Sequence, residues 1–200
     1  MKADKPRYHH GNLRAALVRA AEEIIRENGI EAFSLREAAR RANVSAGAPT
    51  HHFGNAKGLL TEVALLGYQE LGNVLSDGAG SVEPEIELQR MALAYIKFAL
   101  DHTAQFRLMF RNDLVDRTDP RYREFSLRAL KGLGIAAQGG GSDLDLMDPS
   151  ASIKIFSAWS IIHGMAHLII EGKAQYIFPN YDEKSIIETI IPKIVGEIYD

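Results

Sequence analysis

Residues 35–54 read LREAARRANVSAGAPTHHFG, and the spacing of this stretch is that of a helix-turn-helix motif. Ala39 is a small residue where two helices can cross closely, Asn43 is a turn residue four positions later, and Val44 supplies an apolar side chain behind the turn. In such a motif the first helix braces across a phosphate backbone, and the second presents its N-terminal residues to base edges in the major groove. The same shape also occurs as a plain packing unit, so the spacing by itself leaves both interpretations open.

The second half of this stretch is short and has few long side chains. Ser45 is predicted to cap a helix over residues 46–53. Pro49 then lies at the edge of the first turn, where its missing N–H removes few or no backbone hydrogen bonds. The small residues around it let the backbone approach another molecule closely, and we expect Thr50 and His51 to supply most of the polar readout.

Helical periodicity runs through almost every other long segment of the chain. Ser34 and Glu37 have capping-box spacing and predict a helix start at Leu35, and Asn55 is a further predicted cap. There is neither strand alternation nor an internal repeat, so the sequence predicts an all-α fold of about nine helices. The expected helices are 12–28, 35–42, 46–53, 56–75, 84–102, 104–110, one from 120 to the glycine-rich loop near 138, 149–170 and 182–199, with a linker at 76–83.

Composition and charge narrow the function classes. The absence of cysteine excludes a disulfide framework, a thiolate metal site and a cysteine nucleophile, and it fits a reducing, cytosolic interior. The net charge is −3, but the first 60 residues hold ten Lys or Arg against six acidic residues. A basic N-terminal part, residues 1–60, followed by an acidic remainder predicts that the N-terminal part binds a polyanion. Uneven surface charge without a function is the plainer alternative.

One segment has the length of a membrane-spanning helix. Residues 150–170 are apolar, but Lys154, two histidines and four serines are costly in lipid, so we expect a buried helix of a soluble protein and no membrane partner. The N-terminal residues are basic but lack the apolar core of a signal peptide, so secretion is not expected.

Several short motifs follow one another in residues 10–70. They are Ser34-Leu35-Arg36-Glu37, Val44-Ser45 and His52-Phe53-Gly54-Asn55-Ala56-Lys57-Gly58-Leu59-Leu60, behind a helix that ends in Glu27-Asn28-Gly29. With these motifs, residues 10–70 resemble the DNA-binding domain of TetR-family transcriptional regulators. Trp159-Ser160-Ile161-Ile162-His163-Gly164 resembles the Trp, His, Gly signature of that family's WHG-type C-terminal domain.

The resemblance implies both an architecture and a function. The DNA-binding domain would occupy residues 10–70, with its helix-turn-helix at 35–54, and a larger ligand-binding and dimerisation domain would occupy residues 71–200. The implied function is that of a cytoplasmic, nucleoid-associated repressor without enzymatic activity or cofactor. It would bind a near-palindromic operator as a homodimer, with half-sites about 34–36 Å apart. A small-molecule effector would release the DNA, because it favours a state that DNA does not.

The resemblance also assigns DNA contacts. Arg36 and Lys57 are placed for phosphates, together with the helix N-termini near Ser34 and Asn55. The family often carries a lysine where Ala46 stands and a tyrosine where Thr50 stands, so the base contacts of this chain depart from the common pattern. The expected DNA-binding residues are Ser34, Arg36, Ser45, Ala46, Gly47, Pro49, Thr50, His51 and Lys57.

A ligand pocket is expected in the body, although aromatic residues at helical spacing are also typical of a core. Aromatic lining and two histidines suit a small apolar or aromatic ligand of little charge. His163 and His167 are four residues apart, but the local motif offers no third ligand, so no metal site is expected. The expected ligand-binding residues are Tyr95, Phe98, His102, Phe106, Met109, Phe110, Trp159 and His163.

The last helix carries more apolar residues than one stripe holds. A terminal helix buries one side against its own domain, so the excess predicts a second copy as partner. The alternative is a helix sunk deep in a large core. The expected interface residues are Ile187, Ile191, Ile194 and Ile198.

Two other functions stay open at this point. A helical enzyme would draw on Ser157, Ser160 and His163, but the sequence has neither a nucleophile elbow nor a glycine-rich phosphate loop. A helical ligand-binding or adaptor protein without DNA binding would keep the same fold. Salt-sensitive DNA binding distinguishes this second alternative from a regulator.

Overall fold

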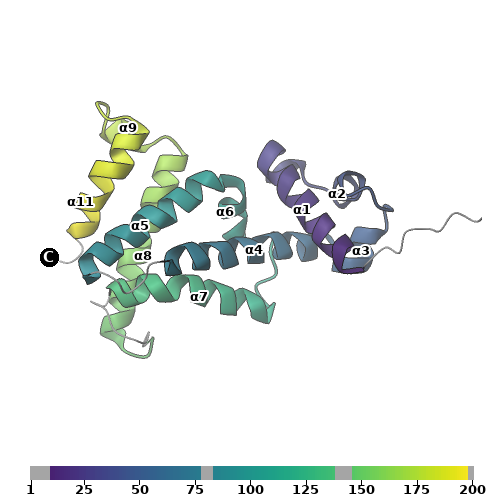
Figure 1. Cartoon of the computed structure of the whole chain (residues 1–200), viewed down its shortest axis with the longest axis horizontal. Coiled ribbons are helices and arrows are strands. Elements are labelled where there is room, and N and C mark those ends of the chain that lie inside the picture. The colour runs from purple at the N-terminus through teal and green to yellow at the C-terminus, as the bar shows by residue number, and fades with distance from the viewer. Residues whose placement is uncertain (1–9, 78–82, 138–145, 198–200) are drawn as a thin grey trace, which may run out of the picture. The chain divides into compact units, whose positions relative to one another are not determined.

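The computed structural model describes residues 10–77, 83–137 and 146–197, and every regular element in those ranges is helical (Figure 1). The all-α prediction is confirmed. Most of the predicted linker at 76–83 and most of the glycine-rich loop near 138 lie outside the described residues.

The chain folds into two compact units. Unit 1 comprises the chain up to Gly67 together with Ala104–Asp119, and unit 2 comprises Tyr68–Thr103 and the chain from Pro120 onward. Helix α4 (Ala56–Ser76) therefore contributes its first half to unit 1 and its second half to unit 2. The domain boundary between residues 70 and 71 stays a prediction from the sequence.

Unit 1 is built around the apolar stripe of α1 (His10–Asn28). Leu17, Ala21 and Ile24 on that stripe are fully buried, and α1 packs against α2 (Leu35–Arg41), which in turn packs against α3 (Ala48–Phe53). Helix α1 ends where the sequence predicts, because the Gly29 amide donates to the Ile25 carbonyl at 2.9 Å and the chain then turns with a Gly29 φ of 78° into η1 (Ile30–Ala32).

A segment from the second half of the sequence completes unit 1. It carries α6 (Thr103–Met109), and the buried Gln105 side chain donates to the Val63 carbonyl of α4 at 3.1 Å. The Asp116 amide donates to the Thr61 hydroxyl at 2.8 Å, and that hydroxyl donates to the Lys57 carbonyl at 2.7 Å. The Thr61 side chain and the Val63 carbonyl of α4 thus hold residues 104–119 in this unit.

Helix α5 (Pro84–Asp101) is the centre of unit 2. It packs against α7 (Pro120–Ala137), α8 (Pro149–Ile170) and α11 (Ile191–Gly196), as Figure 1 shows. Helix α8 begins as Asp148-Pro149 predicts, since the Asp148 carboxylate accepts from the Ser150 and Ala151 amides at 3.0 and 3.3 Å.

The C-terminal segment differs from the single regular helix expected over 182–199. After the short α9 (Ala174–Ile177), the chain forms α10 (Glu183–Ser185), a π-helical turn η2 (Ile186–Ile190) and α11. Pro192 explains the change, because it has no N–H to give the carbonyl one turn earlier. The Ile191 amide instead bonds to the Ile186 carbonyl, five residues back, and the helix widens.

Helix α8 is buried on one face only, which corrects the expectation of a buried helix. Ala158 and Ile162 on the buried face are fully covered, whereas Ile153 and Phe156 on the other face are each 66% exposed. By length and composition alone, α8 is the one helix in the described ranges that is apolar and long enough to cross a membrane, and 28% of that stretch is buried. The described part of the chain thus leaves one face of α8 exposed.

The junction between α3 and α4 depends on a glycine. A Cβ atom added at Gly58 would lie 2.0 Å from the Phe53 carbonyl oxygen, which is backbone and cannot swing away. The Gly58 amide is held from the other side by the Asn55 side chain, which accepts from it at 3.0 Å and so provides the predicted cap of α4.

Gly58→Ala should therefore destabilise unit 1 by about 1–3 kcal/mol, the usual cost of overpacking, although alanine is the better helix former. Gly72→Ala is the matched control on the same helix, because its Cβ would meet Ala129 at an ordinary 3.7 Å. Urea unfolding followed by far-UV circular dichroism measures both. Equal stability of the two variants would contradict the close approach at Gly58.

Candidate nucleic-acid interface

Helix α2 begins as the sequence predicts, but its capping box is only half formed. The Ser34 hydroxyl accepts from the Glu37 amide at 3.2 Å. The Glu37 carboxylate does not return to the Ser34 amide and accepts instead from Arg40 at 2.7 Å, twice, and from Arg41 at 3.1 Å. Paired guanidinium donors outcompete a neutral amide for a carboxylate, since charge-assisted hydrogen bonds are stronger.

The same carboxylate ties the two arginines into a network. Arg41 also donates to Glu27 of α1 at 2.6 Å and so connects α2 to α1. The hydrogen bonds from Arg40 and then Arg41 lower the pKa of Glu37 to about 2. Arg40 and Arg41 are therefore already neutralised by carboxylates of their own unit.

Arg36 is in a different position. It lies on the exposed side of α2 and has no carboxylate partner within the described ranges. Its guanidinium is available for a phosphate, which is the role that the sequence assigns to it.

A left-handed residue closes the turn between α2 and α3, as predicted. Asn43 has a φ of 54°. Its amide donates to the Arg40 carbonyl at 3.2 Å, and the Val44 amide donates to the Ala39 carbonyl at 3.0 Å. These two bonds form a Schellman motif, which satisfies the last carbonyls of α2 and fixes the direction in which the chain leaves it.

Helix α3 starts two residues later than predicted, and Ser45 is not its cap. The helix begins at Ala48 with Gly47 at the N-cap position, and the Ala48 amide bonds to the Ser45 backbone carbonyl at 3.0 Å in a preceding turn. Pro49, at the second helical position, needs no partner for a missing N–H, so the proline starts the helix and does not break it.

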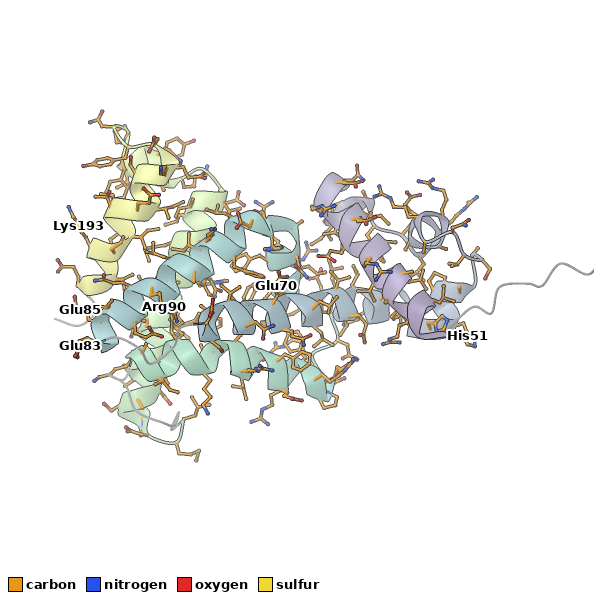
Figure 2. All side chains as sticks on the ribbon, in the orientation of Figure 1. His51, Glu70, Glu83, Glu85, Arg90 and Lys193 are labelled. Carbon is orange, nitrogen blue, oxygen red and sulfur yellow. The ribbon has the colours of Figure 1, made fainter. Side chains whose placement is uncertain are left out.

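Pro49 is buried, so it cannot belong to the exposed DNA-binding face on which the sequence analysis placed it. Ser45, Ala46, Gly47, Thr50 and His51 are exposed, and Figure 2 shows the His51 side chain at the surface of the unit. The exposed side of α3 and its preceding turn thus carries small side chains with one hydroxyl and one imidazole near its centre.

A shallow groove of about 410 Å³ runs along the motif. Its lining joins the first turn of α2 to the turn that precedes α3. The residues are Ser34, Arg36, Glu37, Ala39, Arg40, Val44 and Ala46. Three of the expected DNA-binding residues, Ser34, Arg36 and Ala46, therefore face one concave surface.

Lys57 is the second residue of α4 and is exposed. Its positive charge helps to lower the pKa of two aspartates of the 104–119 segment. The larger cause is the hydrogen bond from Arg111 at Asp113, and the hydrogen bonds from Thr118 at Asp116. A phosphate at Lys57 would therefore share the ammonium group with carboxylates already nearby.

The residues expected to bind a ligand separate into two groups. Phe106, Met109 and Phe110 lie in unit 1 and the other five in unit 2. In unit 2, the Phe98 and His102 rings stack with their centroids 4.9 Å apart. The remaining three, Tyr95, Trp159 and His163, form one cluster.

That cluster is a chain of hydrogen bonds around a buried phenol. The Tyr95 hydroxyl lies 2.8 Å from His163 Nδ1, and the Trp159 indole N–H donates to the same hydroxyl. Burial raises the pKa of Tyr95, whereas burial and the neighbouring His167 lower the pKa of His163 to about 4. At neutral pH, both the phenol and the imidazole of His163 are uncharged.

The residues expected at a dimer interface are not equivalent. Ile191 is 1% exposed and packs inside its own protomer, so it has no surface to offer a partner. Ile187 and Ile194 are half-buried, and Ile198 lies outside the described residues. Four of the large apolar side chains that are exposed in the described ranges share one helix, α8: they are Ile153, Phe156, Ile161 and Leu168.

A further observation on α8 concerns Gly164. A Cβ atom added there would meet nothing within 4 Å, so no neighbour in the protomer requires a glycine at this position. Within the described residues, no group of three His, Asp or Glu side chains could hold a metal ion.

Comparison with known proteins agrees with this architecture. A family model described as "Bacterial regulatory proteins, tetR family" matches residues 17–63, and one described as "Tetracyclin repressor-like, C-terminal domain" matches residues 88–190, more than half of the chain. The chain belongs to the TetR family. The second model covers Trp159, His163 and Gly164, the signature that suggested the C-terminal domain.

Solved structures agree with this fold along the whole chain. A protein of unknown function from Rhodococcus sp. RHA1 is 27% identical, with a TM-score of 0.73 over 96% of this chain and 98% of that chain. A possible TetR-family transcriptional regulator from Streptomyces coelicolor A3(2) is 19% identical, with a TM-score of 0.64 over 92% and 97% of the two chains. The TetR-family regulator PfmR of Thermus thermophilus is 18% identical, with a TM-score of 0.61 over 91% and 96%. No protein with a curated description matches significantly.

The His163 cluster predicts a specific acid sensitivity. The folded state lowers the pKa of His163 from 6.5 to about 4, so the unfolded chain binds a proton more readily, and stability should fall as pH drops from about 6.5 to about 4. His163→Gln should flatten this part of the profile, even if its stability at pH 7 is lower. The fluorescence of Trp159, the single tryptophan of the chain, follows unfolding of the cluster. An unchanged slope in His163→Gln, with His51→Gln as the surface control, would refute this assignment.

Proposed function

We propose that this TetR-family transcriptional regulator is a repressor that binds a near-palindromic operator as a dimer and is released by a small apolar or aromatic ligand. The observation that carries the DNA-binding half of the proposal is the exposed face of α3 together with the exposed Arg36, which has no carboxylate partner among the described residues. The proposal includes no catalytic step, and the regulator acts in the cytoplasm, where the DNA of a bacterial cell lies.

The protein would select its operator sequence by the close fit of α3 and its preceding turn in the DNA groove, more than by contacts from long side chains. Ala46 and Gly47 allow the backbone to approach the bases and offer small apolar surfaces to thymine methyl groups, while Thr50 and His51 supply hydrogen bonds. Arg36 and Lys57 would bind phosphates and set the register without reading sequence.

Contacts to phosphates and contacts to bases have different effects on DNA binding, so mutations distinguish them. Lys57→Ala should weaken specific and non-specific DNA binding alike and reduce the salt slope by about one unit, as expected for one lost phosphate contact. Thr50→Ala and His51→Ala should instead reduce the preference for the operator by about 1–3 kcal/mol per lost base contact and leave non-specific binding intact.

The DNA affinity of each variant is measured by fluorescence anisotropy at several salt concentrations. The probe is the DNA upstream of the gene that encodes this protein, or a fragment that the protein selects from random sequence. Lys97→Ala on α5 removes the same charge from unit 2 and is the control. Absence of any salt-sensitive DNA binding would favour the alternative, a helical ligand-binding or adaptor protein.

The uncovered face of α8 is the proposed dimer interface. Its exposed isoleucines, leucine and phenylalanine form an apolar stripe, and Gly164 leaves room on the same helix for another backbone to approach. A second copy would bury this stripe and would hold the two DNA-binding units at the spacing of the half-sites.

Phe156→Glu should therefore yield monomers in analytical ultracentrifugation, because a carboxylate would be desolvated in the apolar contact. Ile86→Glu introduces the same charge at a 53% exposed position on α5 and should remain dimeric. Ile191→Glu should unfold the protomer, because that residue lies in the core. A dimeric Phe156→Glu would exclude this face.

The proposed effector would act on the contact between α8 and α5. Trp159 and His163 of α8 both bond to Tyr95 of α5, so a ligand with a polar atom that replaces the Tyr95 hydroxyl as partner would change how α8 packs on α5. A ligand acts in this way only if it binds one state of the protein more tightly than the other.

A further inference from the structure

Arg14 of α1 makes contacts at the C-terminal end of α3. Its guanidinium donates to the His52 carbonyl at 3.0 Å and pairs with the Glu62 carboxylate of α4 at 2.7 Å. The Phe53 ring lies under the same group, with the guanidinium carbon 4.5 Å from the ring centroid. One side chain thus joins α1, α3 and α4 within unit 1.

Helix α3 needs such support because it has only six residues. A helix of this length has no stability of its own, and its last carbonyls lack intrahelical partners. The Thr50 carbonyl accepts from the Gly54 amide at 2.9 Å, and the Phe53 carbonyl accepts from the Asn55 amide at 2.9 Å. The His52 carbonyl is satisfied from outside the segment, by Arg14.

An arginine suits this position for chemical reasons. The planar guanidinium offers two donors at a fixed angle, one for the His52 carbonyl and one for Glu62, and its face packs on the Phe53 ring. A lysine could carry the charge but could not make the three contacts together. Because the Glu62 carboxylate neutralises this guanidinium, Arg14 is poorly suited to bind a phosphate.

We propose that Arg14 is a positioning residue that fixes the orientation of α3 and thereby determines sequence selectivity without touching DNA. The inference rests on the proposed role of α3 as the element that reads the operator. The side chains on α3 and on the turn before it are small, so Ala46, Gly47 and Thr50 cannot reach further when the helix tilts. The contacts of such a helix depend on where its backbone lies.

The test compares Arg14→Ala and Arg14→Lys with Arg19→Ala, which removes an exposed arginine from the same helix. The probes are a DNA fragment selected by the wild-type protein from random sequence and a non-specific duplex of equal length. Arg14→Ala should lose about ten-fold or more in affinity for the selected fragment, change by less than about two-fold on the non-specific duplex and keep the wild-type salt slope. The affinity of Arg14→Lys for the selected fragment should lie between those of Arg14→Ala and the wild type. Arg19→Ala should bind both duplexes as the wild type does.

A second measurement does not depend on DNA. Amide hydrogen exchange in the free protein should become faster in α3, at residues 51–53, and should stay unchanged in α2 when Arg14 is replaced. If Arg14→Ala proves too unstable to study, Arg14→Lys is expected to show the same local pattern at smaller amplitude.

Three results would overturn the inference. They are equal losses on both duplexes with a lower salt slope, which would make Arg14 a phosphate contact; wild-type selectivity in Arg14→Ala; and unchanged exchange in α3. Failure of the wild-type protein to select any DNA would instead refute the proposed function, whereas the exchange experiment would still show whether Arg14 holds α3.

Discussion

The geometry of the DNA-binding unit depends on one backbone turn, in which the Val44 amide reaches the Ala39 carbonyl across a left-handed Asn43. A residue with a β-branched side chain at position 43 would strain this conformation, and a helix that continued past Ala42 would carry α3 away from α2. Ala39 is nearly fully buried at the point where the bond forms, so no larger side chain fits between the helices. This bond and the bond from the Asn43 amide to the Arg40 carbonyl set the direction in which the chain leaves α2 and enters α3.

The helix that follows this turn, α3, is too short to be stable without contacts to the rest of the unit. The helix begins at Ala48 without a side-chain cap, and the next residue, Pro49, packs into the interior of the unit. Its C-terminus is held by the Arg14 contacts and by the close approach of Gly58 to the Phe53 carbonyl. The packing interactions are therefore concentrated at the two ends of α3, and the middle of the helix is left open. A short segment with few long side chains is thus held in place by contacts at both of its ends.

The sequence predicted features whose causes are local. The Ser34 and Asn55 caps, the left-handed Asn43 and the Asp148 cap depend on residues within three positions, and all are present. It failed where other contacts competed with the local pattern. The Glu37 carboxylate bonds to Arg40 and Arg41 and not to the Ser34 amide, and Pro49 is buried. Helical spacing suggested Ile191 as an exposed residue, but it is buried in its own protomer, on a helix that packs against α5. Nothing in the sequence indicated that residues 104–119 would pack with α4, because the hydrogen bonds from Gln105 and Asp116 connect segments about 40 to 55 positions apart.

The Trp, His, Gly signature of α8 has a physical explanation that the sequence alone did not provide. Trp159 and His163 are one turn apart, so both reach the same point on α5, and there both are partners of the buried Tyr95 hydroxyl. A buried hydroxyl without partners is costly, so this pair ties α8 to α5 by more than apolar contact. Gly164 follows directly and has open space around it, on a helix whose other face is apolar and exposed. The three residues thus lie where the interior of the protomer meets the exposed apolar face of α8, and a change in the Tyr95 hydrogen bonds would alter how that helix packs on α5.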